Sequence, residues 1–130
     1  MKILIADDSK LLRERIKELL LNVSDKLTII EAENSIEAFN SISESKPDIG
    51  IFDIRMPGGS GLELLNKVRK NKIDMKIIIL TNYPDSEYRK ISLNNGADYF
   101  LSKSDEFDLI GNIIKSYLND YDSSFINWML

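Results

Sequence analysis

The stretch Ile49-Gly50-Ile51-Phe52-Asp53 is a short apolar run that ends in an acid. A second run near the N-terminus has the same form, with Ile3-Leu4-Ile5-Ala6 followed by Asp7-Asp8. Such runs are typical of parallel strands that are buried on both faces. If the two strands are neighbours in one sheet, the three carboxylates meet at its edge and repel one another. A hard divalent cation such as Mg2+ would relieve this repulsion, because it prefers carboxylate and carbonyl oxygens.

The rest of the chain repeats this alternation of apolar runs and amphipathic stretches. Strands are predicted at residues 2–6, 27–32, 49–52, 76–80 and 98–101, with helical stretches between them. The pattern predicts an α/β fold of the (βα)5 type, because crossovers of this length join parallel strands in the right-handed sense. The economical arrangement is a doubly wound, flavodoxin-like parallel sheet of order 2-1-3-4-5. Its topological switch point, where open sheets of this kind bind ligands, lies between the first and third strands.

Helix signals support the same division of the chain. Ser60 with Glu63 forms a capping-box pattern for the third helix, and Ser104 with the acids after it predicts the start of the fifth. Gly96 predicts the end of the fourth helix. That helix, about residues 86–95, has the thinnest apolar face, with Tyr88 and Ile91 as its expected anchors. The second helix is expected to bury Ile36, Phe39 and Ile42.

Composition excludes several classes of function. The chain has 130 residues, no cysteine and no histidine, which rules out thiolate and imidazole chemistry from its own side chains. Its net charge of −4 argues against nucleic-acid binding. No apolar stretch approaches the ~18 residues of a membrane span, and the N-terminus begins directly with a strand, so no membrane contact and a cytoplasmic location are expected.

Two further polar residues follow predicted strands at the same edge. Thr81 ends the fourth strand and Lys103 ends the fifth. A hydroxyl and an ammonium at this place can bind phosphoryl oxygens. Each residue alone has an ordinary explanation, such as a helix cap, a turn or a solvated charge. Together they favour a site in which Asp53 attacks phosphorus. Its metal ligands would be Asp8, Asp53, the carbonyl of Arg55, and Asp7 directly or through water.

With these residues in place, the sequence resembles a receiver domain of the bacterial two-component response regulators. The matching segments are residues 3–8, 53–61, 80–81 and 96–103, in the order and spacing of that family. The resemblance implies a phosphorylation switch, in which a histidine kinase or a His phosphotransfer protein donates a phosphoryl group to Asp53 with Mg2+. It also implies that Thr81 moves toward the phosphoryl group. Phe100 then turns inward and changes the surface of the fourth helix, fifth strand and fifth helix.

Three alternatives remain from the sequence. A Mg2+-dependent phosphatase with an Asp nucleophile would need an acid where Arg55 stands. A flavin carrier would need a Ser-, Thr- or Gly-rich phosphate loop where Asp7-Asp8 stand. A degenerate receiver that only binds proteins would not need the full set of polar residues. We therefore expect a signalling switch with an unknown output protein, and no enzyme activity beyond self-phosphorylation and slow autodephosphorylation.

The predicted receiver domain covers residues 1–121 and leaves a short apolar tail at 122–130. The tail contains five large apolar side chains, Phe125, Ile126, Trp128, Met129 and Leu130. Such a tail either folds back on its own domain, docks on another protein or a second copy of this chain, or stays unstructured. We expect the tail to dock, on its own domain or on a second copy, and a homodimer is one form that such docking would take.

Overall fold

A computed structural model describes the backbone of residues 1–129 and the side chains of residues 1–120. Its main sheet has the parallel strands β1 (Lys2–Ala6), β2 (Thr28–Ala32), β3 (Ile49–Phe52), β6 (Lys76–Thr81) and β7 (Tyr99–Ser102). They lie in the order β2-β1-β3-β6-β7. This confirms the predicted order 2-1-3-4-5, and it places β1 and β3 side by side at the switch point.

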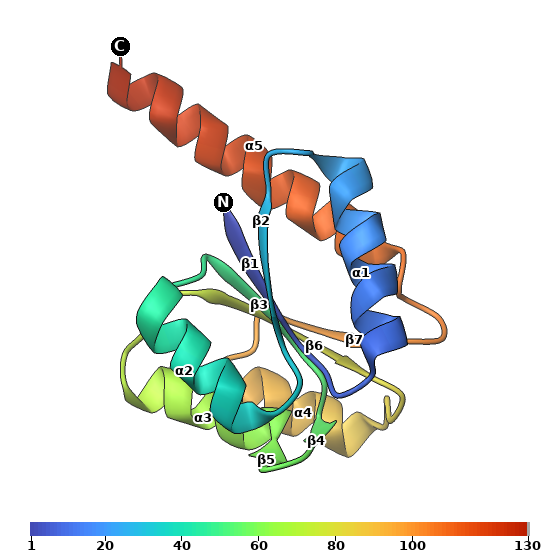
Figure 1. The fold of residues 1–130 in the computed structure, drawn as a ribbon. Helices are drawn as coiled ribbons and strands as arrows, with labels where there is room; N and C mark the ends of the chain where they lie inside the picture. The colour runs from blue at the N-terminus through green and yellow to red at the C-terminus, as the bar shows by residue number, and fades with distance from the viewer. Residues whose placement is uncertain (130) are drawn as a thin grey trace.

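Five helices cover the sheet in two layers (Figure 1). One face carries α1 (Lys10–Val23) and α5 (Leu109–Met129), and the other carries α2 (Ser35–Ser45), α3 (Gly61–Lys70) and α4 (Ser86–Asn94). The strands are apolar on both sides because each face has its own core. Ile3, Ile5, Ile51 and Ile78 pack under α1 and α5, and Leu4, Phe52, Ile77 and Ile79 pack under the other layer. Burying each such side chain stabilises the fold by about 1.5–3 kcal/mol.

Side-chain caps fix where four of the helices begin. The N-caps are Ser9, Asn34, Ser60 and Asp85, and each accepts a hydrogen bond from the backbone N–H three residues later. The cap predicted at Ser60 is therefore confirmed. The predicted end of α4 is also confirmed, since the helix stops at Asn94 and Gly96 takes a positive φ of 101°.

The start predicted for the fifth helix at Ser104 is wrong, because α5 begins at Leu109. The hydroxyl of Ser104 lies 3.0 Å from that of Ser102 instead of capping a helix. Glu106 folds back, and its carboxylate accepts a hydrogen bond from the backbone N–H of Ser102 at 3.1 Å. The polar groups of the segment after Lys103 therefore find hydrogen-bond partners in short-range turns before the helix starts.

The expected anchors of two helices are confirmed in part. Ile42 is in the core and Phe39 and Tyr88 pack against it, whereas Ile36 and Ile91 are exposed. In α4 the fully buried residue is Ser92, whereas Tyr88 is half-buried and Ile91 is 38% exposed. Tyr88 and Ser92 are four residues apart and so share one helical stripe, which turns Ile91 toward solvent. In α2 the buried pair is Ala38 and Ile42, again four apart, and Ile36 in the first turn is 65% exposed.

The loop after β3 contains a small hairpin that the sequence did not predict. Its strands are β4 (Arg55–Met56) and β5 (Gly59–Ser60), paired antiparallel. Gly58 and Gly59 take positive φ values of 79° and 135°, which side chains disfavour, so the turn depends on glycine. The hydroxyl of Ser35 donates to the carbonyl of Gly58 at 2.7 Å and ties the hairpin to α2.

At the other end of the chain, α5 continues as far as Met129, and its last turns run past the end of the sheet (Figure 1). The side chains of residues 121–130 lie outside the described part, so the docking of the apolar tail stays a prediction. Among the described residues, no helix is long and apolar enough to cross a bilayer.

Candidate functional site

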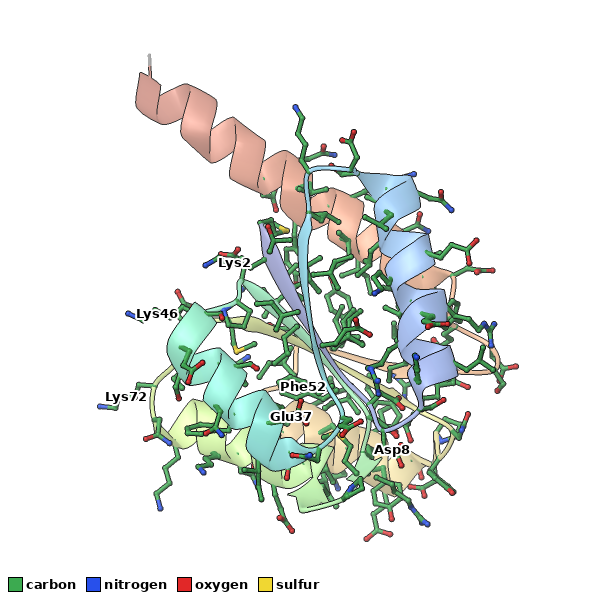
Figure 2. The ribbon with its side chains drawn as sticks, in the orientation of Figure 1. Lys2, Asp8, Glu37, Lys46, Phe52 and Lys72 are labelled. Carbon is green, nitrogen blue, oxygen red and sulfur yellow. The ribbon has the colours of Figure 1, made fainter. Side chains whose placement is uncertain are left out.

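The three predicted acids meet at the carboxyl edge of β1 and β3. The pairing of β1 with β3 extends one residue past the end of β3, because the N–H of Asp53 donates to the carbonyl of Ala6 at 2.9 Å. One carboxylate oxygen from each of Asp7, Asp8 and Asp53 lies within 4.8 Å of the others. Figure 2 shows Asp8 just past the end of β1, where the chain turns into α1. Asp8 is exposed, whereas Asp7 and Asp53 are buried.

Lys103 reaches this cluster from the end of β7. Its Nζ lies 2.8 Å from Oδ2 of Asp7 and 3.4 Å from Oδ2 of Asp53. All three side chains are at most 9% exposed, so the ammonium is the counter-ion of two buried carboxylates. The sequence predicted that Lys103 would lie at this edge, and the structure brings it into direct contact with both acids.

The charges around Asp53 do not balance. Burial raises the pKa of the Asp53 carboxyl above its ordinary value, and the charge of Asp7 raises it further, while Lys103 opposes the shift. One ammonium thus faces three carboxylates. Carboxylate oxygens that are close together and short of positive charge suit a hard divalent cation, and the exposed Asp8 leaves one side of the cluster open to it. The residues present therefore fit a metal site.

Thr81 lies at the end of β6, completely buried. Its hydroxyl accepts a hydrogen bond from the N–H of Tyr83 at 2.9 Å, and its carbonyl accepts one from the N–H of Lys103 at the same distance. Phe100, three residues before Lys103, is 2% exposed and lies in the core on the face covered by α2, α3 and α4, with the guanidinium of Arg89 from α4 5.1 Å from its ring centre. Tyr99 beside it is 37% exposed and meets Tyr117 edge-on.

The loop that follows Asp53 is held from both sides. The guanidinium of Arg55 stacks on the ring of Tyr83, 3.8 Å from its centre, which joins this loop to the one after β6. At the far end of the hairpin, a Cβ on Gly61 would collide with the backbone carbonyl of Asp53. Glycine at position 61 thus lets the start of α3 lie directly against the acid. The role of the Arg55 carbonyl as a metal ligand stays a prediction.

Sequence reasoning missed Arg13 and Glu31. Arg13 lies on α1, and its Nη1 donates to the backbone carbonyl of Asp7 at 2.7 Å. Its Nε also contacts Glu31 of β2 at 3.2 Å. In the sequence Arg13 looks like any other cation on the polar face of a helix, because its partners are brought to it only by the pairing of β1 with β2.

A parallel open sheet with clustered acids and a lysine at its switch point is typical of doubly wound α/β domains that bind a ligand at the carboxyl edge of the sheet. Comparison with known families agrees with this class, since the model of the response regulator receiver domain matches residues 3–115. The chain therefore belongs to the response regulator receiver domain family.

Two curated relatives illustrate the likeness. The oxygen regulatory protein NreC of Staphylococcus carnosus is 37% identical over 92% of this chain and 56% of its own length. The transcriptional regulatory protein HptR of Staphylococcus aureus is 33% identical over 90% of this chain and 48% of its own length. The chain thus spans about half the length of the curated relatives it matches.

Solved structures share the fold. A CheY-like response regulator receiver domain protein from Methanospirillum hungatei superposes with a TM-score of 0.80 at 31% identity, covering 95% of this chain and 97% of that one. A DNA-binding response regulator of the LuxR family from Staphylococcus aureus gives a TM-score of 0.81 at 28% identity, covering 88% and 96%.

Proposed function

We propose that this domain is a signalling switch that is turned on when Asp53 accepts a phosphoryl group from a histidine kinase or a His phosphotransfer protein. The observation that carries the proposal is the contact of Lys103 with both Asp7 and Asp53 at the switch point of the sheet. An ammonium between two buried carboxylates is already placed to bind an anion that is built on one of them.

In the proposed step, a carboxylate oxygen of Asp53 forms a bond to phosphorus. The P–N bond of the donor phosphohistidine breaks, its electron pair stays with the imidazole nitrogen, and the donor ring takes up a proton. The product is an aspartyl phosphate, which adds negative charge to a buried position. The burial that raises the pKa of Asp53 also leaves its carboxylate poorly solvated and therefore more nucleophilic when it is ionised.

A divalent cation, Mg2+ in our proposal, would be held by Asp8 and Asp53, with Asp7 directly or through water and the carbonyl of Arg55, and would neutralise phosphoryl oxygens. The protein's own groups supply the rest. Lys103 would turn from Asp7 toward the new phosphoryl oxygens. The Thr81 hydroxyl, which now accepts from Tyr83, would donate to one of them after a rotation of its side chain.

Access for a donor is consistent with the proposal. A hollow of about 340 Å3 lies beside the acids and is lined by Lys103, Ser104, Asn82 and residues of α1. Leu11 at its rim is 70% exposed, which gives an apolar contact for an approaching helix of a donor protein.

The output of the switch would be read at the surface of α4, β7 and α5. Both Thr81 and Lys103 connect the site to these elements, since the N–H of Lys103 bonds to the Thr81 carbonyl. Phe100 is already buried in this structure, so the change would lie in the packing of α4 around its ring rather than in its entry into the core. The net charge of −4 favours a protein rather than a nucleic acid as the partner of this domain.

The proposal is tested by intact mass after incubation with acetyl phosphate and Mg2+. The parent should gain one phosphoryl group, and Asp53→Asn should gain none because it keeps the shape and lacks the nucleophile. Asp105→Asn is the matched control, since it makes the same change at an exposed acid of the loop after Lys103. Equal labelling of the parent and Asp53→Asn, or no labelling of any protein, would reject Asp53 as the acceptor.

A further inference from the structure

Arg13 is a largely buried cation that lies beside the predicted site and contacts one of its acids. It lies in the first turns of α1, and its backbone N–H bonds to the carbonyl of Ser9, the N-cap. Its side chain is only 11% exposed. The guanidinium donates to the backbone carbonyl of Asp7 at 2.7 Å and to Oε1 of Glu31 at 3.2 Å. Arg13 thus joins α1, the end of β1 and β2 at one point.

The carbonyl that Arg13 binds belongs to the peptide unit between Asp7 and Asp8. The other groups of Asp7 are held as well, because its N–H donates to the carbonyl of Ala32 at 3.0 Å. Its Oδ1 accepts from the N–H of Ser9 at 2.8 Å, and its Oδ2 accepts from Lys103. Without Arg13, the peptide between the two acids would lose the side-chain contact that fixes its plane. The exposed Asp8 carboxylate would then be free to swing away from Asp53.

The charge of Arg13 by itself works against cation binding. A guanidinium this close to the acids repels a divalent ion, and Glu31 offsets part of that charge. Hydrogen bonding and charge from Lys17 and Arg13 lower the pKa of Glu31, so its carboxylate is ionised at neutral pH. Lys17 contacts the same carboxylate at 3.0 Å, but it makes no contact with Asp7.

We propose that Arg13 is a positioning residue for the divalent-cation site, which acts by fixing the Asp7–Asp8 peptide so that both carboxylates face Asp53. The part of this inference that concerns Mg2+ binding rests on the cluster of Asp7, Asp8 and Asp53 and does not depend on the proposed function. Its consequence for phosphorylation rests on the proposed function. Groups that orient metal ligands from behind typically contribute about 10- to 100-fold to metal affinity.

The direction in which Mg2+ affinity changes when Arg13 is replaced distinguishes a positioning role from a purely electrostatic one. Removal of a nearby positive charge should strengthen Mg2+ binding if only charge matters. Loss of a positioning hydrogen bond should weaken it. Arg13→Met removes the donors and keeps much of the length, and we expect its Kd for Mg2+ to rise about tenfold. Lys17→Met is the matched control, because it removes a cation from the same Glu31 and leaves the Asp7 carbonyl bound. Its Kd should stay within about twofold of the parent or fall.

The measurement is isothermal titration of Mg2+ into the metal-free domain, well below the melting temperature of every variant, with circular dichroism to check folding. A Kd for Arg13→Met that is equal to or lower than that of the parent would overturn the inference, as would a parent that binds no Mg2+. A purely structural role would lower the melting temperature and leave the Kd unchanged. If Arg13→Met does not fold, Arg13→Lys decides, because one ammonium cannot reproduce the forked contact with Asp7 and Glu31, and its Kd must rise.

The outcome is independent of the fate of the proposed function. A weaker Kd in Arg13→Met, with no phosphoryl transfer to the parent, would keep the positioning role and reject the switch. Phosphoryl transfer to Asp53 with an unchanged Kd for Mg2+ in Arg13→Met would keep the switch and reject the positioning role.

Discussion

The ammonium of Lys103 lies 0.6 Å closer to Asp7 (2.8 Å) than to Asp53 (3.4 Å), although Asp53 is the proposed acceptor. Lys103 therefore leaves Asp53 as the less completely neutralised of the two buried acids. This agrees with the raised pKa of Asp53, to which burial contributes most. If Asp53 is the acceptor as proposed, this geometry would leave its carboxylate reactive and Lys103 close enough to move onto a phosphoryl group.

Removal of that ammonium should destabilise the fold. In Lys103→Met two buried carboxylates lose their counter-ion, and the free energy of unfolding should fall by about 3 kcal/mol at neutral pH without metal. Saturating Mg2+ should recover part of this loss, because it supplies positive charge at the same place. Urea unfolding with and without Mg2+ measures both effects. Lys10→Met, an exposed cation at the start of α1, is the control and should change little. A Lys103→Met protein as stable as the parent would show that the lysine is not the counter-ion.

We predict that one substitution at Asp8 stabilises the metal-free domain and removes its stabilisation by Mg2+. It is the exposed member of the acid cluster, so Asp8→Asn relieves repulsion and should raise the melting temperature of the metal-free domain slightly. The same variant should lose the stabilisation that the parent gains from Mg2+, because it lacks one carboxylate ligand. Thermal unfolding over a Mg2+ titration compares the two proteins. An Mg2+ response in Asp8→Asn equal to that of the parent would remove Asp8 from the ligand set.

Ser92 should limit the stability of α4. Its side chain is fully buried, and its hydroxyl has no hydrogen-bond partner among the described residues. A buried hydroxyl without a partner costs about 1–3 kcal/mol, so Ser92→Ala should raise the free energy of unfolding by about 1 kcal/mol. Ser86→Ala, at an exposed position of the same helix, is the control.

The same substitution should affect switching. A helix that is held more tightly opens less readily, so beryllofluoride, which mimics an aspartyl phosphate, should change amide exchange in α4 less in Ser92→Ala than in the parent. In the parent the change should be concentrated in residues 83–101 and be small in residues 27–45. A Ser92→Ala protein that is less stable than the parent would mean that its hydroxyl has a partner after all.

Glu31 predicts a pH dependence that is separate from the acid cluster. Its pKa is lowered below the ordinary value of 4.5, chiefly by the hydrogen bond from Lys17. A carboxyl with a lowered pKa in the folded state stabilises the fold above its ordinary value, and this contribution is lost as the pH falls through the folded-state pKa. Glu31→Gln should therefore be less stable than the parent at pH 7, and the difference should close in acid, as the pH falls below the ordinary value of 4.5 and through the lowered folded-state pKa. Urea midpoints at several pH values test this, and a difference that widens in acid would contradict it.

The sequence predicted the parts of this molecule that depend on local pattern. The sheet order and the meeting of Asp7, Asp8, Asp53 and Lys103 follow from where apolar runs end, because parallel strands bring their carboxyl ends to one edge. The family match was also reached from these residues.

What the sequence could not predict depends on long-range geometry. Arg13 finds the Asp7 carbonyl only after β1 and β2 pair, and Arg55 stacks on Tyr83 only after two loops converge. The start of α5 at Leu109 is a local miss of another kind, because Glu106 folds back to the N–H of Ser102 in a short-range turn that competes with the capping signal at Ser104. Ser92 is the buried residue of α4 because of the helix's rotation on the sheet, which its weak apolar pattern leaves undetermined.

The apolar tail at residues 122–130 gives the last prediction. The backbone of α5 continues to Met129 and runs past the sheet (Figure 1). Five large apolar side chains in this segment are costly to leave in water, and we expect them to dock. Trp128 is the only tryptophan, so its fluorescence reports on the tail alone.

If the tail docks, Trp128 should emit at a shorter wavelength than free tryptophan in water. If the tail docks on a second copy of the chain, the blue emission should be lost on dilution, and truncation after Asp122 should give a monomer by light scattering. If it docks on its own domain, the emission should not depend on concentration, and truncation should lower the melting temperature instead. Phe125→Ser tests the same contact without shortening the chain and should act in the same direction as truncation. Emission at the wavelength of free tryptophan, together with a truncated protein of unchanged mass and stability, would mean that the tail does not dock.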